Sequence, residues 1–110
     1  MINIDLEQIK KEVSEGVRAA LGDKVNKIIL YGSYARGDYR EDSDVNFMVL
    51  ADIDEENLGD YKDDILSIAD SVSLEYDAVV SIFLEDRHLF YSHMGVLPFN
   101  RSILDEGIEI

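Results

Sequence analysis

The chain has 110 residues, of which 10 are basic and 24 acidic, so its formal net charge is −14. It is 46% hydrophobic and contains no Cys, and this length fits one domain over residues 1–110 with a core of modest size. The lack of Cys excludes a disulfide framework and thiolate metal sites. The acidity argues against a protein that holds nucleic acid by neutralising phosphates.

The N-terminal segment MINIDLEQIKKE carries charges where a signal peptide needs an apolar stretch. No run in the sequence approaches the roughly 20 apolar residues of a membrane-spanning helix. We therefore expect a cytoplasmic protein with no membrane partner and no direct binding to nucleic acid.

Apolar residues recur at helical intervals near the start of the chain and predict an amphipathic helix over residues 5–21, with Asp5 as its cap and Gly22 as its stop. The apolar run from Ile28 to Tyr31 then predicts a short strand buried on both faces. A second strand is expected over residues 42–50. The apolar positions of the helix are Ile4, Leu6, Ile9, Val13, Val17 and Ala20.

The second half of the chain continues the alternation of helix and strand. Its order predicts an α/β fold, in which a small mixed β-sheet of three strands is flanked by helices. The expected elements are a helix over 54–74, a strand over 75–84, a short helix near 86–94, a helix near 99–106 and a brief extended end.

The most informative segment joins the first two predicted strands. There Gly32 and Ser33 end a strand and open a short helix, and ten residues separate Ser33 from Asp44. Without a side chain, Gly32 lets a bulky polyanion approach the backbone. Ser33 adds a hydroxyl, and the free N–H groups of the next helical turn point the same way. These features predict a small cradle for a triphosphate.

Polar residues that can hold a metal follow on neighbouring strands. Asp44 and Asn46 are two apart on a predicted strand, so their side chains leave the same face about 6.5 Å apart along the backbone. Asp77 stands at the start of the third predicted strand, which would bring its carboxylate beside Asp44. Since Mg²⁺ prefers oxygen ligands and substrate phosphates, the three residues are candidate magnesium ligands.

The pattern of Gly-Ser, ten residues, a spaced acidic pair and a later Asp on a strand resembles the DNA polymerase β-like nucleotidyltransferase superfamily. The chain is most similar to its minimal nucleotidyltransferases, the MNT-domain proteins typically encoded beside a HEPN-domain partner. Three segments carry the resemblance. GSYARGDYREDSDVNFMVL is similar to the family's first signature block, EYDAVVSIFL to its third-carboxylate strand and PFNRSILDEGIEI to its C-terminal ending.

The resemblance implies Mg²⁺-dependent nucleotidyl transfer from ATP or another nucleoside triphosphate. It assigns phosphate binding to Gly32 and Ser33, phosphate contact to Arg36, the first metal-ligand position to Asp44 and the third carboxylate to Asp77. In toxin–antitoxin members of the family, the MNT protein is an antitoxin that adds AMP to a tyrosine of its HEPN-domain toxin. The resemblance therefore also implies a HEPN-domain toxin as partner and acceptor.

Asn46 departs from this pattern, because the family carries a carboxylate at the second metal-ligand position. An amide oxygen still coordinates a hard cation but supplies no negative charge, so we expect weakened or absent transferase activity. Two explanations fit. The chain is a natural variant retained for binding its partner, or the residue is a deliberate Asp→Asn change that traps an inactive form.

Two further readings remain beside the enzyme. One is a non-catalytic binding module that keeps the fold and neutralises its partner by sequestration, and the other is an acidic decoy of nucleic acid. The acidity serves either solubility or docking to a basic partner, and Ile108 and Ile110 are apolar candidates for partner coverage. Tyr34 and Tyr39 flank the cradle, where they serve packing or contact a base.

Overall fold

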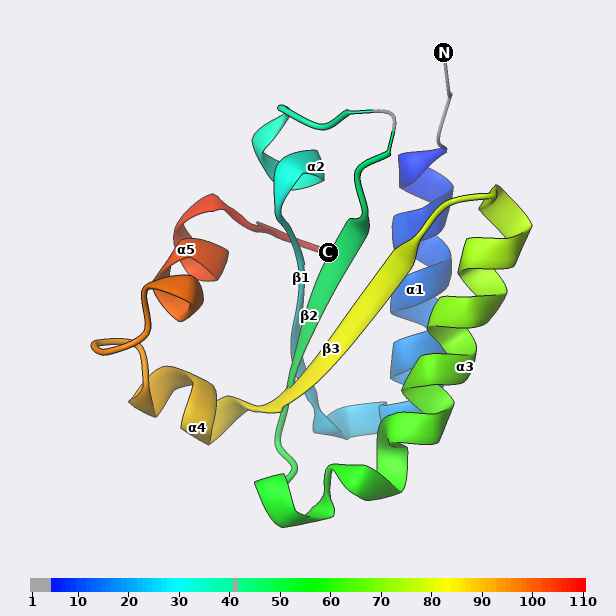
Figure 1. Ribbon diagram of the computed structural model, residues 1–110. Coiled ribbons are helices and arrows are strands. Elements are labelled where there is room, and N and C mark those ends of the chain that lie inside the picture. Colours follow the sequence, from blue (N-terminus) through cyan, green and yellow to red (C-terminus); the bar gives the residue numbers. More distant parts are fainter. Residues whose placement is uncertain (1–4, 41) are drawn as a thin grey trace.

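The computed structural model describes residues 5–40 and 42–110, so Ile4 and Glu41 lie outside the described residues (Figure 1). The helices and strands follow the predicted alternation along the chain. In order they are α1 (Leu6–Leu21), η1 (Gly22–Lys24), β1 (Val25–Tyr31), α2 (Ser33–Arg36), β2 (Val45–Ala51), η2 (Glu55–Asn57), α3 (Gly59–Tyr76), β3 (Val80–Asp86), α4 (Arg87–Ser92), α5 (Pro98–Glu106) and β4 (Ile108–Glu109).

The strands form one mixed sheet in the order β3-β2-β1-β4, which confirms the predicted α/β class. β1 runs antiparallel to β2 and β4, whereas β2 and β3 are parallel. The fourth strand corrects the expectation of three. Ile108 pairs with Leu30, and the Ile110 N–H donates to the Ile28 carbonyl at 2.9 Å. The backbone of the C-terminal end therefore pairs with its own sheet, while the Ile108 side chain stays 42% exposed.

Helices α1 and α3 cover one face of the sheet (Figure 1). The apolar stripe of α1 is buried there, as its period predicts, with Ile9, Val13 and Val17 fully excluded from solvent. Gly16 weakens a helix in principle. Here it lets α3 approach closely, because a Cβ at Gly16 would lie 3.1 Å from Cγ2 of Ile68.

Helices α4 and α5 cover part of the opposite face, where they bury a second, smaller apolar cluster. The buried Asn100 of α5 donates from its side-chain Nδ2 to the Phe90 carbonyl of α4 at 3.0 Å, which ties the two helices together. Of the helices in the described ranges, none combines the length and apolar character needed to cross a membrane. The cluster consists of Ile29, Met48, Leu50, Phe90 and Ile103.

Two strands begin later than the sequence indicates. β2 starts at Val45, so Asp44 precedes the strand directly. β3 starts at Val80, which corrects the expectation that Asp77 begins the strand. The reason is that α3 continues to Tyr76 and ends at Asp77, whose N–H donates to the Ser73 carbonyl and whose φ of 50° is left-handed.

Candidate functional site

Three chain segments meet at one end of the sheet. β1 ends there and leads into α2, and the antiparallel register sets Tyr31 opposite Asn46 at the start of β2. The parallel register sets Val45 opposite Val80, so the start of β3 lies at the same end. Figure 1 shows α2 beyond these strand ends. The topology therefore brings the Gly32–Ser33 turn and Asn46 to one end of the sheet, with Asp44 directly before β2 and Asp77 three positions before β3.

The turn at Gly32 faces Asn46 closely. Gly32 has a φ of 83°, which L-residues rarely adopt, and a Cβ added there would lie 3.0 Å from Nδ2 of Asn46. Its carbonyl accepts the N–H groups of Ala35 and Arg36 at 3.0 and 3.1 Å, which starts α2 at Ser33. A side chain at Gly32 would therefore fill the space between this turn and the strand.

Asn46 lies on the face of the sheet that α1 and α3 do not cover. Val45 and Phe47, its neighbours along the strand, are completely buried against those helices. Because neighbouring side chains along a strand point to opposite faces, Asn46 lies on the other face, and Asp44 directly precedes the strand. Asp44 is exposed and Asn46 is half-buried, so a ligand from solvent can reach both.

Asp77 is exposed and lies at the C-terminal end of α3, three positions before β3. The residue that the register sets opposite Asn46 is instead Ser81, a half-buried hydroxyl that sequence reasoning missed. The alternation of polar and exposed positions with apolar ones in VSIFLE is the signal that points to Ser81. The third-carboxylate role of Asp77 remains a prediction.

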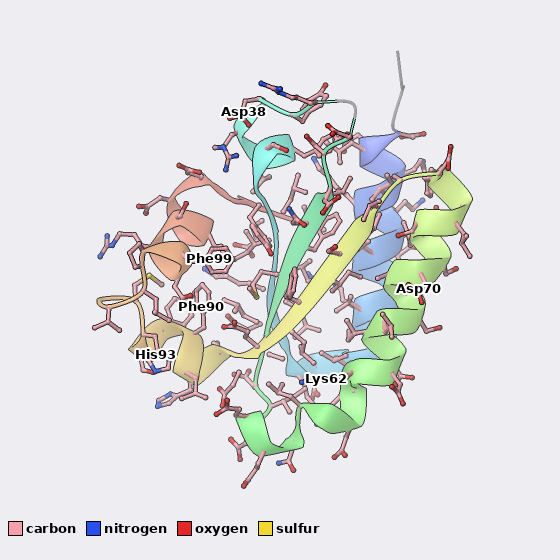
Figure 2. All side chains as sticks on the ribbon, in the orientation of Figure 1. Asp38, Lys62, Asp70, Phe90, His93 and Phe99 are labelled. Carbon is pink, nitrogen blue, oxygen red and sulfur yellow. The ribbon has the colours of Figure 1, made fainter. Side chains whose placement is uncertain are left out.

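Arg36 is engaged by two carboxylates. Its Nε lies 3.2 Å from Asp38 and its Nη1 lies 3.5 Å from Glu106 of α5. The hydrogen bond and charge of Asp38, followed by those of Glu106, raise the pKa of the Arg36 guanidinium. Figure 2 shows Asp38 just beyond α2. A guanidinium has five N–H donors, so the predicted phosphate contact of Arg36 does not require either carboxylate to leave. Glu106 was not foreseen, because it is 70 positions away in sequence.

Two tyrosines next to the cradle pack on each other. The rings of Tyr34 and Tyr39 are stacked with centroids 4.4 Å apart, and Tyr34 is only 8% exposed. Burial, followed by the neighbouring Tyr39, raises the pKa of Tyr34. Packing is thus an observed role of this pair, and contact with a base remains a prediction.

Three aromatic side chains lie next to the site on the open face of the sheet. Tyr31, opposite Asn46, lies 5.7 Å from Phe99 and 6.5 Å from Phe83 between ring centroids. About half of each Phe side chain is exposed. Burial, followed by the charge of Glu85, raises the pKa of Tyr31 to about 12. The polar site therefore borders an apolar surface on which a ring or an apolar side chain can rest.

The residues beside the Gly32 turn that could hold a magnesium ion are Asp44, Asn46 and Ser33. Within the described ranges, no group of three or more His, Cys, Asp or Glu side chains is arranged to hold a metal. The oxygens at the site come from the Asp44 carboxylate, the Asn46 amide and the Ser33 hydroxyl. Mg²⁺ commonly takes one or two carboxylates and completes its shell with water and substrate phosphates. The oxygens of these residues are of the kind that Mg²⁺ prefers, and their role as ligands remains a prediction.

A mixed sheet whose first strand ends in a Gly-Ser turn, with polar residues opposite on the next strand, is the arrangement of a nucleotidyltransferase fold. Comparison with known proteins agrees. The chain belongs to the nucleotidyltransferase domain family, which matches residues 6–110.

Two similar proteins come from Methanocaldococcus jannaschii, and both are named as candidate protein adenylyltransferases. One is 33% identical over 101 residues, which cover 92% of this chain and 93% of the relative. The other is 40% identical over 107 residues and covers 97% of this chain and 100% of the relative.

Solved structures show the same fold at lower identity. A minimal nucleotidyltransferase is 21% identical and superposes with a TM-score of 0.57, covering 98% of both chains. A toxin–antitoxin crystal structure with AMP-PNP gives a TM-score of 0.58 at 18% identity and covers 91% of this chain and 70% of the other. The toxin–antitoxin pair MntA–HpeT gives 0.57 at 18% identity, over 98% of this chain and 72% of the other.

Proposed function

We propose that this chain is a minimal nucleotidyltransferase that transfers AMP from Mg-ATP to a tyrosine hydroxyl of a HEPN-domain toxin, and so acts as an antitoxin. One observation carries the proposal: the Gly32 turn approaches Asn46 so closely that a Cβ there would lie 3.0 Å from the amide nitrogen, so the Gly-Ser turn and the predicted second metal-ligand position are neighbours. The names of the two archaeal relatives support protein adenylylation, and those of two structural neighbours support a toxin partner.

Each residue of the site has a separate task in this proposal. Gly32 leaves room for the triphosphate at the backbone, and Ser33 donates its N–H and hydroxyl to phosphate oxygens. Asp44 and Asn46 would hold Mg²⁺, which would neutralise charge that develops on the transferring phosphate. Asp77 keeps the third-carboxylate role near the attacking hydroxyl.

The reaction is an in-line displacement at the α-phosphorus. The tyrosine oxygen forms a bond to phosphorus, the bond to the bridging oxygen between the α- and β-phosphates breaks, and pyrophosphate leaves with that electron pair. The phenol proton passes to solvent water as the oxygen attacks. Positioning by the residues above and charge neutralisation provide the catalysis, because this chemistry needs little from the protein beyond them.

Asn46 sets the level of activity. It supplies an oxygen but no negative charge, so Mg²⁺ is bound more weakly than between two carboxylates. Losing several kcal/mol of transition-state stabilisation lowers a rate by about three decades. A chain limited in this way still neutralises a toxin by binding it, so sequestration without AMP transfer is the second function that Asn46 favours.

The test uses ATP labelled in the α-phosphate, Mg²⁺ and the chain together with its co-purified partner. We expect the Asn46→Asp variant to incorporate label faster than the unchanged chain by about three decades, and the Gly32→Ala variant of that protein to lose the gain. Gly95→Ala is the control, because a Cβ there meets nothing within 4 Å.

Label in the γ-phosphate must not appear in the partner, since that would indicate phosphorylation. Equal incorporation by the unchanged chain and Asn46→Asp refutes the assigned role of position 46. A tight complex without label from either protein favours sequestration over transfer.

A further inference from the structure

β3 lies at the edge of the sheet, where β2 is its only strand neighbour among the described residues. Figure 1 shows it running along the outer side of β2. Its seven residues read VSIFLED, so the first five positions carry no charge and no Pro. Edge strands are usually protected by Lys, Pro or a bulge, because their free backbone groups pair readily with another chain. An edge of this kind favours pairing with a partner.

The direction of the backbone defines the part of β3 that is available. The Val45 N–H donates to the Val79 carbonyl at 2.8 Å, so the backbone groups of Val79 point toward β2. Since these groups alternate along a strand, those of Val80, Ile82 and Leu84 point away from β2.

At Val80 the outward N–H already has a partner within the chain. It donates to the Ser73 hydroxyl oxygen at 2.9 Å, and that hydroxyl donates to the Ala69 carbonyl at 2.7 Å. The outward edge that an added strand can use therefore begins at Ile82 and continues to Leu84.

A groove runs between this edge and α3. Its volume is about 600 Å³, and its apolar lining comes from α3 on one side and from Ile82 to Leu84 on the other. Leu66 of α3 lines it with 60% of its surface exposed. Lys62, Asp63 and Asp70 of α3 contribute its charged lining, and Figure 2 shows Lys62 and Asp70 along this helix.

The negative charge around the groove determines which kind of partner can bind there. α3 carries five acidic residues and one basic residue, and the whole chain has a net charge of −14. A second copy would bring the same carboxylates together at close range, which opposes pairing of β3 with itself. A positively charged partner gains from the same field during encounter. The acidic residues of α3 are Asp60, Asp63, Asp64, Asp70 and Glu75.

We propose that an extended segment of a basic partner adds to the sheet along Ile82 and Leu84. Its apolar side chains lie in the groove, and its Lys or Arg side chains lie near Asp63 and Asp70. The inference rests on the proposed function in one respect, that this partner is the acceptor of AMP. Because the start of β3 lies beside Val45, the docked segment leads toward the site.

The probe is a short capped peptide of alternating valine and lysine, added to the full chain without nucleotide, with binding measured by fluorescence anisotropy. We expect Leu66→Arg to weaken binding at least about tenfold, because it places a like charge in the groove. Leu74→Arg is the matched control, since Leu74 is an exposed leucine of α3 outside the groove and its variant keeps full binding.

A second pair of variants tests the charge. We expect Asp70→Asn to weaken binding several-fold, and the same change at Asp64, on α3 but outside the groove lining, to have less effect. Hydrogen exchange provides the backbone evidence: the bound peptide should slow exchange at the amides of Ile82 and Leu84. Both amides exchange at unchanged rates if the peptide binds elsewhere.

Three results overturn the proposal: no binding of the peptide, equal binding of its valine–glutamate counterpart, or sedimentation showing that the chain pairs with itself through β3. The peptide assay contains no ATP, so it separates the two hypotheses. Peptide binding without AMP transfer supports the docking site and refutes the proposed transferase activity. AMP transfer without peptide binding supports the transferase activity and refutes the docking site.

Discussion

At the scale of single residues, the backbone position of Asn46 is fixed by strand pairing on both sides. The register sets it opposite Tyr31 on one side and Ser81 on the other, and the Gly32 turn approaches its amide. Changing its charge therefore alters the chemistry of the site without requiring a new backbone. This is why Asn46→Asp is an informative substitution, whereas Gly32→Ala alters both conformation and space.

Because of Tyr31, the free energy of unfolding depends on pH in the alkaline range. Burial and Glu85 raise its pKa from 10.0 to about 12, so the fold favours the protonated phenol. That contribution to stability is fully present below pH 10 and is lost as the pH rises through about 12. The loss is about 1 kcal/mol, well below the value for the full shift, because the half-buried ring is screened by water.

The Tyr31→Phe variant cannot ionise at this position. Between pH 10 and 12 its melting temperature should therefore fall less than that of the unchanged chain. The control is Tyr91→Phe at the exposed Tyr91 of α4, which should follow the unchanged protein. Thermal denaturation by circular dichroism measures all three proteins. If the melting temperatures of Tyr31→Phe and the unchanged protein fall equally with pH, Tyr31 is not the group that titrates.

At the scale of elements, the junction between α5 and β4 depends on a glycine. Gly107 follows α5 directly, and a Cβ there would overlap the Ile103 carbonyl and Cγ2 of Ile29. We expect Gly107→Ala to lower the free energy of unfolding by about 1–3 kcal/mol, because backbone and a buried strand residue must move. The matched change Gly95→Ala should stay within about 0.5 kcal/mol, since open space surrounds that position.

Thermal and urea denaturation of both variants check this prediction. A Gly107→Ala protein as stable as Gly95→Ala would show that the chain end is loosely attached. In that case the backbone of β4 would also be available to a partner.

The sequence predicted elements well where one period dominates. The stripe through Ile9, Val13 and Val17 predicted α1, and the apolar run of β1 predicted a buried strand. Prediction from the sequence failed where contacts between residues distant in the chain determine where a strand begins or what it pairs with. The start of β3 depends on the Ser73 hydroxyl, which bonds Val80, and the pairing of β4 depends on β1.

The candidate site shows the same division. The Gly-Ser turn and Asp44 were predicted from local spacing, since a strand followed by a turn fixes them within one short segment. Neither the ion pair of Arg36 with Glu106 nor the register that brings Ser81 to Asn46 was predicted. Both depend on elements that only the complete sheet brings together.

At the scale of the whole molecule, 14 net negative charges share a body of 41 × 29 × 18 Å. At 0.01 M salt the screening length is about 30 Å, so charges repel across the thickness of the molecule, whereas at 0.15 M it is about 8 Å. Self-repulsion of this kind destabilises the compact state. We therefore expect sodium chloride to raise the melting temperature between these concentrations by a few degrees.

Magnesium chloride at the same ionic strength separates screening from binding. If Asp44 and Asn46 hold Mg²⁺, ten times its dissociation constant adds about 1.4 kcal/mol beyond the effect of sodium chloride. The increment should grow in Asn46→Asp and disappear in Asp44→Ala. It should persist in Asp64→Ala, which removes the same charge from α3. Identical melting temperatures in the two salts, for both the unchanged chain and Asn46→Asp, would show that the site binds no Mg²⁺ without nucleotide. The ion would then have to arrive with the triphosphate.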